Sequence, residues 1–146
     1  MVLNRCPTKD RLLNWGLQTD ALCVLCRAYD ESKDHLFFQC CYSKDLWDRV
    51  AHKCDLTSSS SWETTLQSLR CSPGTRLQKK LRLLSWQATI YLIWSERNSR
   101  IHRNHFKSHT ALFRELDHLI RIRIASFRFN DPAQSSDLLS LWFLRS

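Results

Sequence analysis

Three cysteines and one histidine lie within an eighteen-residue segment near the start of the chain. Cys23, Cys26, His35 and Cys40 form a C-x2-C-x8-H-x4-C array. Three thiolates and one imidazole complete the tetrahedral coordination of a structural Zn²⁺ site and leave no position for water or substrate. The array therefore predicts one structural zinc ion. Cys41 is an alternative fourth ligand, but four residues between histidine and cysteine is the commoner spacing in short zinc motifs, which favours Cys40.

The residues between and beside the ligands carry two further expectations. Residues 27–34 are polar and turn-prone, and they predict a loop that stays outside the core. Residues 36–38 (Leu-Phe-Phe) are expected to bury beside the metal and keep water away from it. Tyr29 is the only aromatic residue in the loop and a candidate for stacking on a nucleic-acid base, as in zinc knuckles. Phe37 and Phe38 are alternatives, although a place in the core explains them better.

The sequence offers little support for a catalytic site. The Tyr-Asp-Glu stretch at residues 29–31 is only superficially like a polymerase acidic pair, because no strand pattern surrounds it. A zinc deaminase needs H-x-E followed by P-C-x-x-C, whereas here the C-x2-C precedes the histidine. His102, His105 and His109 could hold a second metal ion, but exposed histidines in a basic segment explain this spacing better. We therefore predict no enzymatic activity and no small-molecule substrate.

Hydrophobic periodicity predicts that a mainly α-helical fold positions the ligands. Thr8 and Gly16 bracket a first helix, Ser32 can cap a second helix that carries the last two ligands, and Ser43 can cap a third. A short helix follows Ser61.

The second half of the chain predicts a helical hairpin over about residues 75–129. Its first helix has an apolar stripe, and its middle should be surrounded by protein. The stripe consists of Leu77, Leu81, Leu84, Ala88 and Tyr91. The second helix runs from about residue 110, and residues 138–143 are expected to be a docking tail. We expect the hairpin to pack on the zinc module through its tryptophans.

These elements suggest a domain organisation. Residues 1–54 form the zinc-binding module, residues 55–61 form a serine-rich linker, and residues 62–146 form a helical region that packs on the module within one compact domain. With 146 residues, of which 43% are hydrophobic, the chain can bury a core, yet a bound metal would still add useful stability. The sequence does not determine an oligomeric state.

Composition also bears on the compartment. Seven cysteines are an odd number, and no charged and then apolar leader precedes them, which favours a reducing compartment, nucleus or cytoplasm, over secretion. No apolar run approaches the roughly 20 residues of a membrane span, so we expect no membrane association.

Positive charge is concentrated in the predicted hairpin. Residues 1–50 contain seven basic and seven acidic side chains, whereas residues 71–130 contain twelve basic and three acidic ones. Such an excess favours RNA or DNA as a partner, bound through phosphate without sequence reading. A solvated basic face is the alternative, and Arg97 and Asn98 beside Trp94 could equally be structural and hold the hairpin together by hydrogen bonds. The candidate nucleic-acid-binding residues are Arg97, Arg100, Arg103, Lys107, Lys79 and Lys80.

Several motifs around the ligand array resemble one known family. They read T-x-D-R-L at residues 8–12, W-G at 15–16, C-x-L-C at 23–26, H-L-F-F-x-C at 35–40 and Leu-Trp at 46–47. This set resembles the zinc-binding domain that follows the reverse transcriptase of plant LINE-type (non-LTR) retrotransposons. Residues 91–100 resemble the Y-x-I-W-x-E-R-N-x-R stretch that often follows this domain. The resemblance implies a region that helps the polymerase engage its RNA or target DNA.

The chain also departs from that family. Members usually carry more sequence ahead of T-x-D-R-L, including a tryptophan-bearing stretch, whereas here only seven residues precede Thr8. Polymerase and endonuclease regions are absent, so neither activity carries over, and we expect a short reading frame derived from a longer element. The alternative functions are a structural or protein-interaction module, or a retroelement fragment without function.

Overall fold

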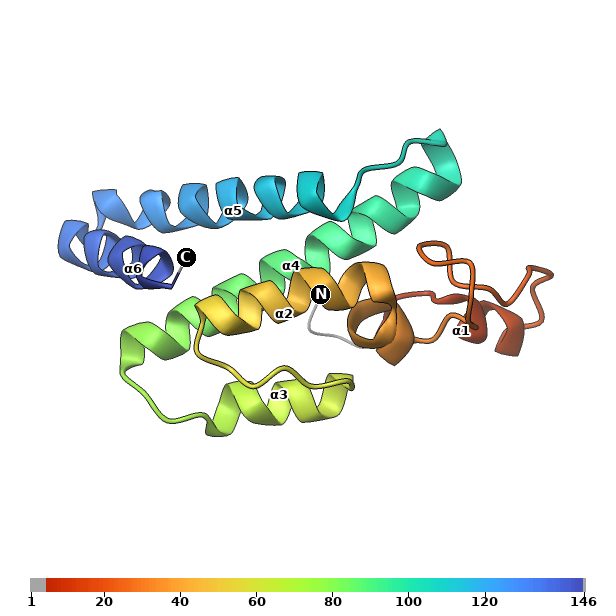
Figure 1. The fold of residues 1–146 in the computed structure, drawn as a ribbon, viewed down its shortest axis with the longest axis horizontal. Helices are drawn as coiled ribbons and strands as arrows, with labels where there is room; N and C mark the ends of the chain where they lie inside the picture. The colour runs from red at the N-terminus through yellow and green to blue at the C-terminus, as the bar shows by residue number, and fades with distance from the viewer. Residues whose placement is uncertain (1–4, 146) are drawn as a thin grey trace.

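The computed structural model describes residues 5–145, and helices dominate it (Figure 1). Among these residues the nearest approach to a sheet is an isolated antiparallel bridge between Leu22 and Asp30, in the loop that carries the C-x2-C pair. The mainly helical prediction is confirmed. In chain order the elements are α1 (Lys9–Asn14), the π-helix η1 (His35–Gln39), α2 (Cys41–Lys53), α3 (Trp62–Cys71), α4 (Arg76–Arg103), α5 (His109–Ala125), the 3-10 helix η2 (Ser126–Phe129) and α6 (Pro132–Leu144).

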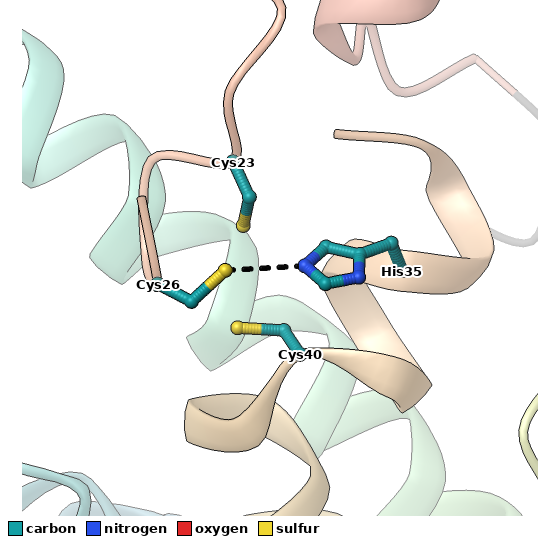
Figure 2. A group of neighbouring side chains, drawn as sticks. All are labelled: Cys23, Cys26, His35 and Cys40. Atoms are coloured by element: carbon teal, nitrogen blue, oxygen red, sulfur yellow. Dashed lines mark hydrogen bonds between the residues drawn. The ribbon is translucent and has the colours of Figure 1, made fainter. Parts of the chain in front are cut away.

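The first three helical segments begin close to where the sequence places them. Thr8 is the N-cap of α1, and Gly16 follows the helix at φ +82°, a left-handed conformation that favours glycine. The Ser32 hydroxyl accepts a hydrogen bond of 3.1 Å from the His35 backbone N–H. The prediction for Ser43 was wrong: α2 begins at Cys41, and Ser43 is buried in its first turn. Cys40 occupies the N-cap position instead, without a side-chain cap hydrogen bond, and its side chain turns toward the other metal-ligand candidates (Figure 2).

The antiparallel hairpin is present, with α4 and α5 side by side (Figure 1). A capping box between Thr75 and Gln78 starts α4, and Asn104 ends it in a left-handed conformation at φ +50°. The Ser108 hydroxyl then caps α5 by accepting from the Ala111 backbone N–H at 3.1 Å. One part of the predicted stripe was wrong, because Tyr91 is 45% exposed.

Helix α4 lies at the centre of the fold and packs against α2, α3, α5 and α6. Aromatic rings join the zinc module to it. The ring of Phe37 lies 6.4 Å from that of Trp94, and Trp62 lies 5.5 Å from Phe37 and 5.2 Å from Trp86. Edge-to-face and tilted ring pairs at such distances add about 0.5–1.5 kcal/mol each beyond area burial. Trp94 of the hairpin thus packs on Phe37 of the zinc module, whereas Trp86 contacts Trp62, which lies outside residues 1–54.

The C-terminal segment, which the sequence predicts to be a docking tail, forms the regular helix α6. The Asp131 carboxylate accepts from the Gln134 backbone N–H at 2.9 Å, and Pro132 occupies the first turn of α6. Leu138 and Trp142 are fully buried, so α6 contributes to the core. Within residues 5–145, none of the helices has the length and apolar character to cross a bilayer.

Candidate metal centre

The four predicted ligands converge on one point (Figure 2). The sulfur atoms of Cys23, Cys26 and Cys40 and one ring nitrogen of His35 lie within 4.8 Å of one another, and Cys26 Sγ is 3.3 Å from His35 Nε2. Sulfurs around a tetrahedral zinc ion, with Zn–S bonds of about 2.3 Å, are roughly 3.8 Å apart. The group is therefore slightly wider than the coordinated geometry, and an inward movement of about 1 Å or less would close it.

A tight loop presents Cys23 and Cys26 together. The Cys23 backbone N–H donates to the Tyr29 carbonyl at 2.8 Å, and the Arg27 backbone N–H donates to the Cys23 carbonyl at 2.9 Å. Arg27 adopts φ +56°, which reverses the chain directly after the second cysteine. These bonds fix the C-x2-C turn so that both sulfurs face the same side.

The other two candidates come from the two ends of a π-helical turn. The Cys40 backbone N–H donates to the His35 carbonyl at 2.7 Å, which is the five-residue step of a π-helix. In an α-helix, with 3.6 residues per turn, side chains five positions apart point about 140° away from each other. The wider π turn reduces this angle and brings the histidine and the cysteine to one side. The H-x4-C spacing thus has a structural cause.

The sulfur atoms of Cys23 and Cys40 lie within 4.8 Å of each other, and each thiol shifts the pKa of the other. The hydrogen bond from Cys40 lowers the pKa of Cys23, while burial opposes this, and the backbone N–H groups of Cys26 and Leu25 lower the pKa further. The same bond and burial raise the pKa of Cys40. A thiolate is the form that binds metal, so one ligand is already favoured in that form.

The donor set fits zinc. Three sulfurs and one imidazole nitrogen are the ligands that Zn²⁺ prefers in structural sites, and Cys23, Cys40 and His35 are buried. Cys41, the alternative fourth ligand, is exposed and lies outside the group. Leu36, directly after the histidine ligand, is fully buried.

A buried carboxylate ties the loop of residues 23–34, called the metal loop below, to α4. Glu31 is 1% exposed, and its Oε1 accepts from Arg97 Nη2 at 2.7 Å and from Arg97 Nε at 3.0 Å. Oε1 also accepts from the Lys9 backbone N–H at 3.0 Å, and Oε2 accepts from the Val24 backbone N–H at 3.2 Å. The expectation that residues 27–34 stay outside the core was thus wrong for Glu31. Its carboxylate compensates the buried guanidinium and holds a backbone amide of the C-x2-C turn.

A second ion pair fixes the turn between α4 and α5. Glu96 Oε1 accepts from Arg100 Nε at 2.9 Å and from the Lys107 backbone N–H at 2.8 Å. Arg100 also donates to the Leu25 carbonyl in the metal loop at 3.1 Å, and the Tyr42 hydroxyl donates to the Lys107 carbonyl at 2.8 Å. Burial, followed by the charge of Glu96, raises the pKa of Tyr42 to about 12.

The candidate nucleic-acid-binding residues do not form one exposed face. Arg97 is 4% exposed, with its guanidinium 4.6 Å from the Trp94 ring, and the Arg100 side chain is 10% exposed. Both guanidinium groups are held by buried carboxylates, so they stabilise the fold and are poorly placed to meet phosphate. Arg103 and Lys79 are exposed.

Lys80 and Lys107 are only partly exposed, and each already has a partner. Lys80 lies 3.9 Å above the Phe127 ring and donates to Gln134. Lys107 Nζ is 2.5 Å from a Glu115 carboxylate oxygen.

Other candidates stand apart from the metal group. His102, His105 and His109 are exposed, and the cysteine–histidine group is the only potential metal cluster among the residues that the structure describes. Tyr29 is 70% exposed with its ring 5.8 Å from that of His35, so it remains accessible. Phe37 and Phe38 are buried, as expected for core residues.

Sequence reasoning missed Glu31 and Glu96. Glu96 had a recognisable signal, because it stands four residues before Arg100, the spacing of a helical ion pair. Glu31 had none, since its partner Arg97 is sixty-six residues away and the surrounding loop is polar.

Comparisons with known proteins agree with the metal centre. A comparison with curated proteins finds no match, and neither does one with solved structures. Residues 1–47, which contain all four ligands, match the family model described as zinc-binding in reverse transcriptase. The first third of the chain is therefore similar to the zinc-binding domains of reverse transcriptases.

Proposed function

We propose that this chain is a non-catalytic nucleic-acid-binding domain, stabilised by one zinc ion and derived from a plant LINE-type (non-LTR) retrotransposon. The observation that carries the proposal is the pairing of a reverse transcriptase zinc-binding domain with a helical hairpin of excess positive charge. Counterion release from phosphate gives such a surface affinity for RNA or DNA without sequence reading. The Y-x-I-W-x-E-R-N-x-R stretch at residues 91–100 supports the origin.

The zinc ion has a structural role in this proposal. Cys23, Cys26, His35 and Cys40 would hold it, and bound zinc would fix the loop against α4. Four protein ligands leave no open coordination position, so the metal supplies folding free energy rather than chemistry.

Exposed and partly exposed basic residues near the two ends of α4 are the candidate phosphate contacts. Arg76 and Lys79 lie near its first residue, whereas Arg103 and Lys107 lie at or just beyond its last residue. The helix has 28 residues, which corresponds to a length of roughly 42 Å at 1.5 Å per residue. The two groups are therefore far enough apart to be tested separately.

Salt-titrated binding of zinc-loaded protein to labelled RNA and DNA tests the proposal. We expect affinity to fall with salt, and each substitution that removes one phosphate-binding side chain should reduce the log-log slope by about 0.7–0.9. The variants are Arg76→Ala/Lys79→Ala and Arg103→Ala/Lys107→Ala, with Lys44→Ala as an exposed basic control on α2. Parental binding at every salt concentration in both double variants would contradict the proposed role of the basic hairpin.

A protein-interaction module is the second candidate function. Several large apolar side chains on α5, η2 and α6 are more than half exposed, which is typical of surfaces that bind other proteins. They are Ile122, Phe129, Phe143 and Leu144. Absence of salt-dependent nucleic-acid binding by the parent protein would favour this function over the first.

A further inference from the structure

A cleft of about 910 Å³ separates the metal loop from the C-terminal half of α4. Val24, Leu25 and Arg27 form the wall on the loop side, and Trp94 and Ile101 belong to the α4 side. The loop and this half of α4 lie at the same end of the molecule (Figure 1). Ligand sites typically have volumes of about 300–1,000 Å³, so the cleft has room for a nucleotide.

The cleft continues into a stripe along α4. A second hollow of about 300 Å³ shares Trp94, Asn98 and His102 with the cleft. Its lining residues repeat at steps of three and four, so they follow one side of the helix for about three turns. The stripe, as we call it, consists of Tyr91, Trp94, Ser95, Asn98, Ser99, His102 and Arg103. From its first to its last residue it spans roughly 18 Å, or about five stacked nucleotides at ~3.4 Å each.

Two aromatic side chains in this region are open to solvent. Tyr91 in the stripe is 45% exposed, and Phe106 at the cleft is 61% exposed. The Arg100 guanidinium lies 5.2 Å from the Phe106 ring and helps to orient it. Exposed rings of this kind can stack on unpaired bases of any sequence.

The charge of the lining favours a polyanion. The cleft and stripe include several basic side chains but only one carboxylate, Asp20, which pairs with Lys9 at 2.8 Å and with Arg27 at 3.6 Å. Among the cations, Arg103 is exposed and the Arg27 side chain is 61% exposed, so both stand where phosphate can approach. A neighbouring hollow of about 380 Å³ shares Arg103 with the stripe but is also lined by Glu96 and Glu115. Two carboxylates disfavour a polyanion, so we do not include this hollow in the site.

We propose that the cleft and the stripe bind single-stranded nucleic acid, RNA or DNA, with bases stacking on Phe106 and Tyr91 and phosphates meeting Arg27 and Arg103. The inference rests on the proposed function and adds to it the form of the ligand and the place of binding. A single strand can follow one side of a helix and insert a base into the cleft. The bases of a duplex are stacked inside it and cannot reach these rings without flipping out.

The experiment measures the anisotropy of labelled oligo(U), oligo(dT) and a matched duplex with the zinc-loaded full chain. Loss of one stacked base is worth about 1–3 kcal/mol, so Tyr91→Ala and Phe106→Ala should each raise the Kd for the single strands by roughly 5- to 150-fold. Tyr91→Phe should bind like the parent because it keeps the ring. Phe129→Ala is the matched control, since Phe129 is 94% exposed on η2 and outside the site.

A photo-crosslinking arm does not depend on the folding of variants. Oligonucleotides that carry a photoreactive uracil should crosslink to the parent protein at Tyr91 or Phe106.

An equal rise in the Kd of the ring variants for RNA and for DNA would show that the rings contact the bases alone, whereas a larger rise for RNA would show that the 2′-hydroxyl contributes. Either result supports the proposal.

Four results would overturn it. If the parent binds with the expected salt dependence but neither ring variant changes the Kd, the proposed function stands and this inference falls. Equal or tighter binding of the duplex, or crosslinks confined to the α4 N-terminal end, would also refute it. If the parent binds no nucleic acid at low salt, both the function and the inference fail.

Discussion

Replacement of Glu31 by glutamine tests whether the buried ion pair organises the metal loop. Glu31 contacts three groups at once: the Arg97 guanidinium and the backbone N–H groups of Lys9 and Val24. Glutamine has nearly the same shape but no charge, and its NH₂ group must face one of these donors. The substitution therefore leaves a buried cation uncompensated and at least one donor poorly paired.

The expected loss follows from burial. The two side chains are 5% and 0% exposed, and removal of one partner from such a pair destabilises a protein by about 3–5 kcal/mol. This is a large part of the roughly 5–15 kcal/mol that stabilises a typical domain. The Lys44–Asp48 pair on α2 is exposed by 53% and 39%, and Lys44→Ala should change stability by only about 0.3–0.5 kcal/mol. Lys44→Ala is therefore the matched control, because it also changes the net charge by one.

Urea unfolding followed by circular dichroism, with saturating zinc, measures the free energy of unfolding. In a double-mutant cycle, Glu31→Gln/Arg97→Met should lose less than the sum of the two single variants, by roughly 1–3 kcal/mol. Because Glu31 binds the amide that follows Cys23, the single variant should also weaken zinc affinity by about 10- to 100-fold in chelator competition. Additive losses below 1 kcal/mol and an unchanged zinc affinity would refute this role of the ion pair.

Three further predictions follow from the metal site and its surroundings. Cys40→Ser should lower zinc affinity sharply whereas Cys41→Ser should bind one zinc ion like the parent; the reverse order, measured by chelator competition, would exchange the two ligands. The pKa of Tyr42 is raised from its usual value of 10.0 to about 12, so the folded state favours the protonated phenol. Its contribution to stability is complete below pH 10 and is lost as pH rises toward 12. The difference in unfolding free energy between the parent and Tyr42→Phe should therefore shrink over that interval, and a constant difference would contradict it. Removal of zinc by a chelator should expose residues 5–34 to proteolysis, because those residues contain few helical hydrogen bonds; an unchanged cleavage pattern would contradict this.

The ligand set and the helices could be predicted because their signals are local. The four candidate metal ligands lie within eighteen residues, and each long helix repeats its apolar residues at intervals of three and four. Caps at Thr75 and Ser108 mark the starts of α4 and α5 in the sequence itself. The π-helical turn at His35–Gln39 had no separate signal, but it follows from the H-x4-C spacing once both side chains must reach one metal.

The sequence offered a structural role for Arg97 only as an alternative, because its partner Glu31 lies sixty-six residues away. Arg100 had a local signal in Glu96, four residues earlier, but the burial of that pair was not predictable. Arg97 and Arg100 are identical in type to Arg103, and they differ only in the carboxylates that face them. A count of charges treats all three as equal contributors to a basic surface. Burial separates them: a guanidinium beside a buried carboxylate stabilises the fold, whereas an exposed one remains available to phosphate.

The same contacts connect the zinc ion to the proposed binding cleft. The metal loop forms one wall of the cleft through Val24, Leu25 and Arg27, and it is held to α4 by Arg97 and Arg100. Bound zinc would fix the loop from one side, and the two arginines fix it from the other. In the proposed function, a structural metal without contact to the nucleic acid would thus control its binding, because the metal would set the position of a cleft wall and not the chemistry of the site.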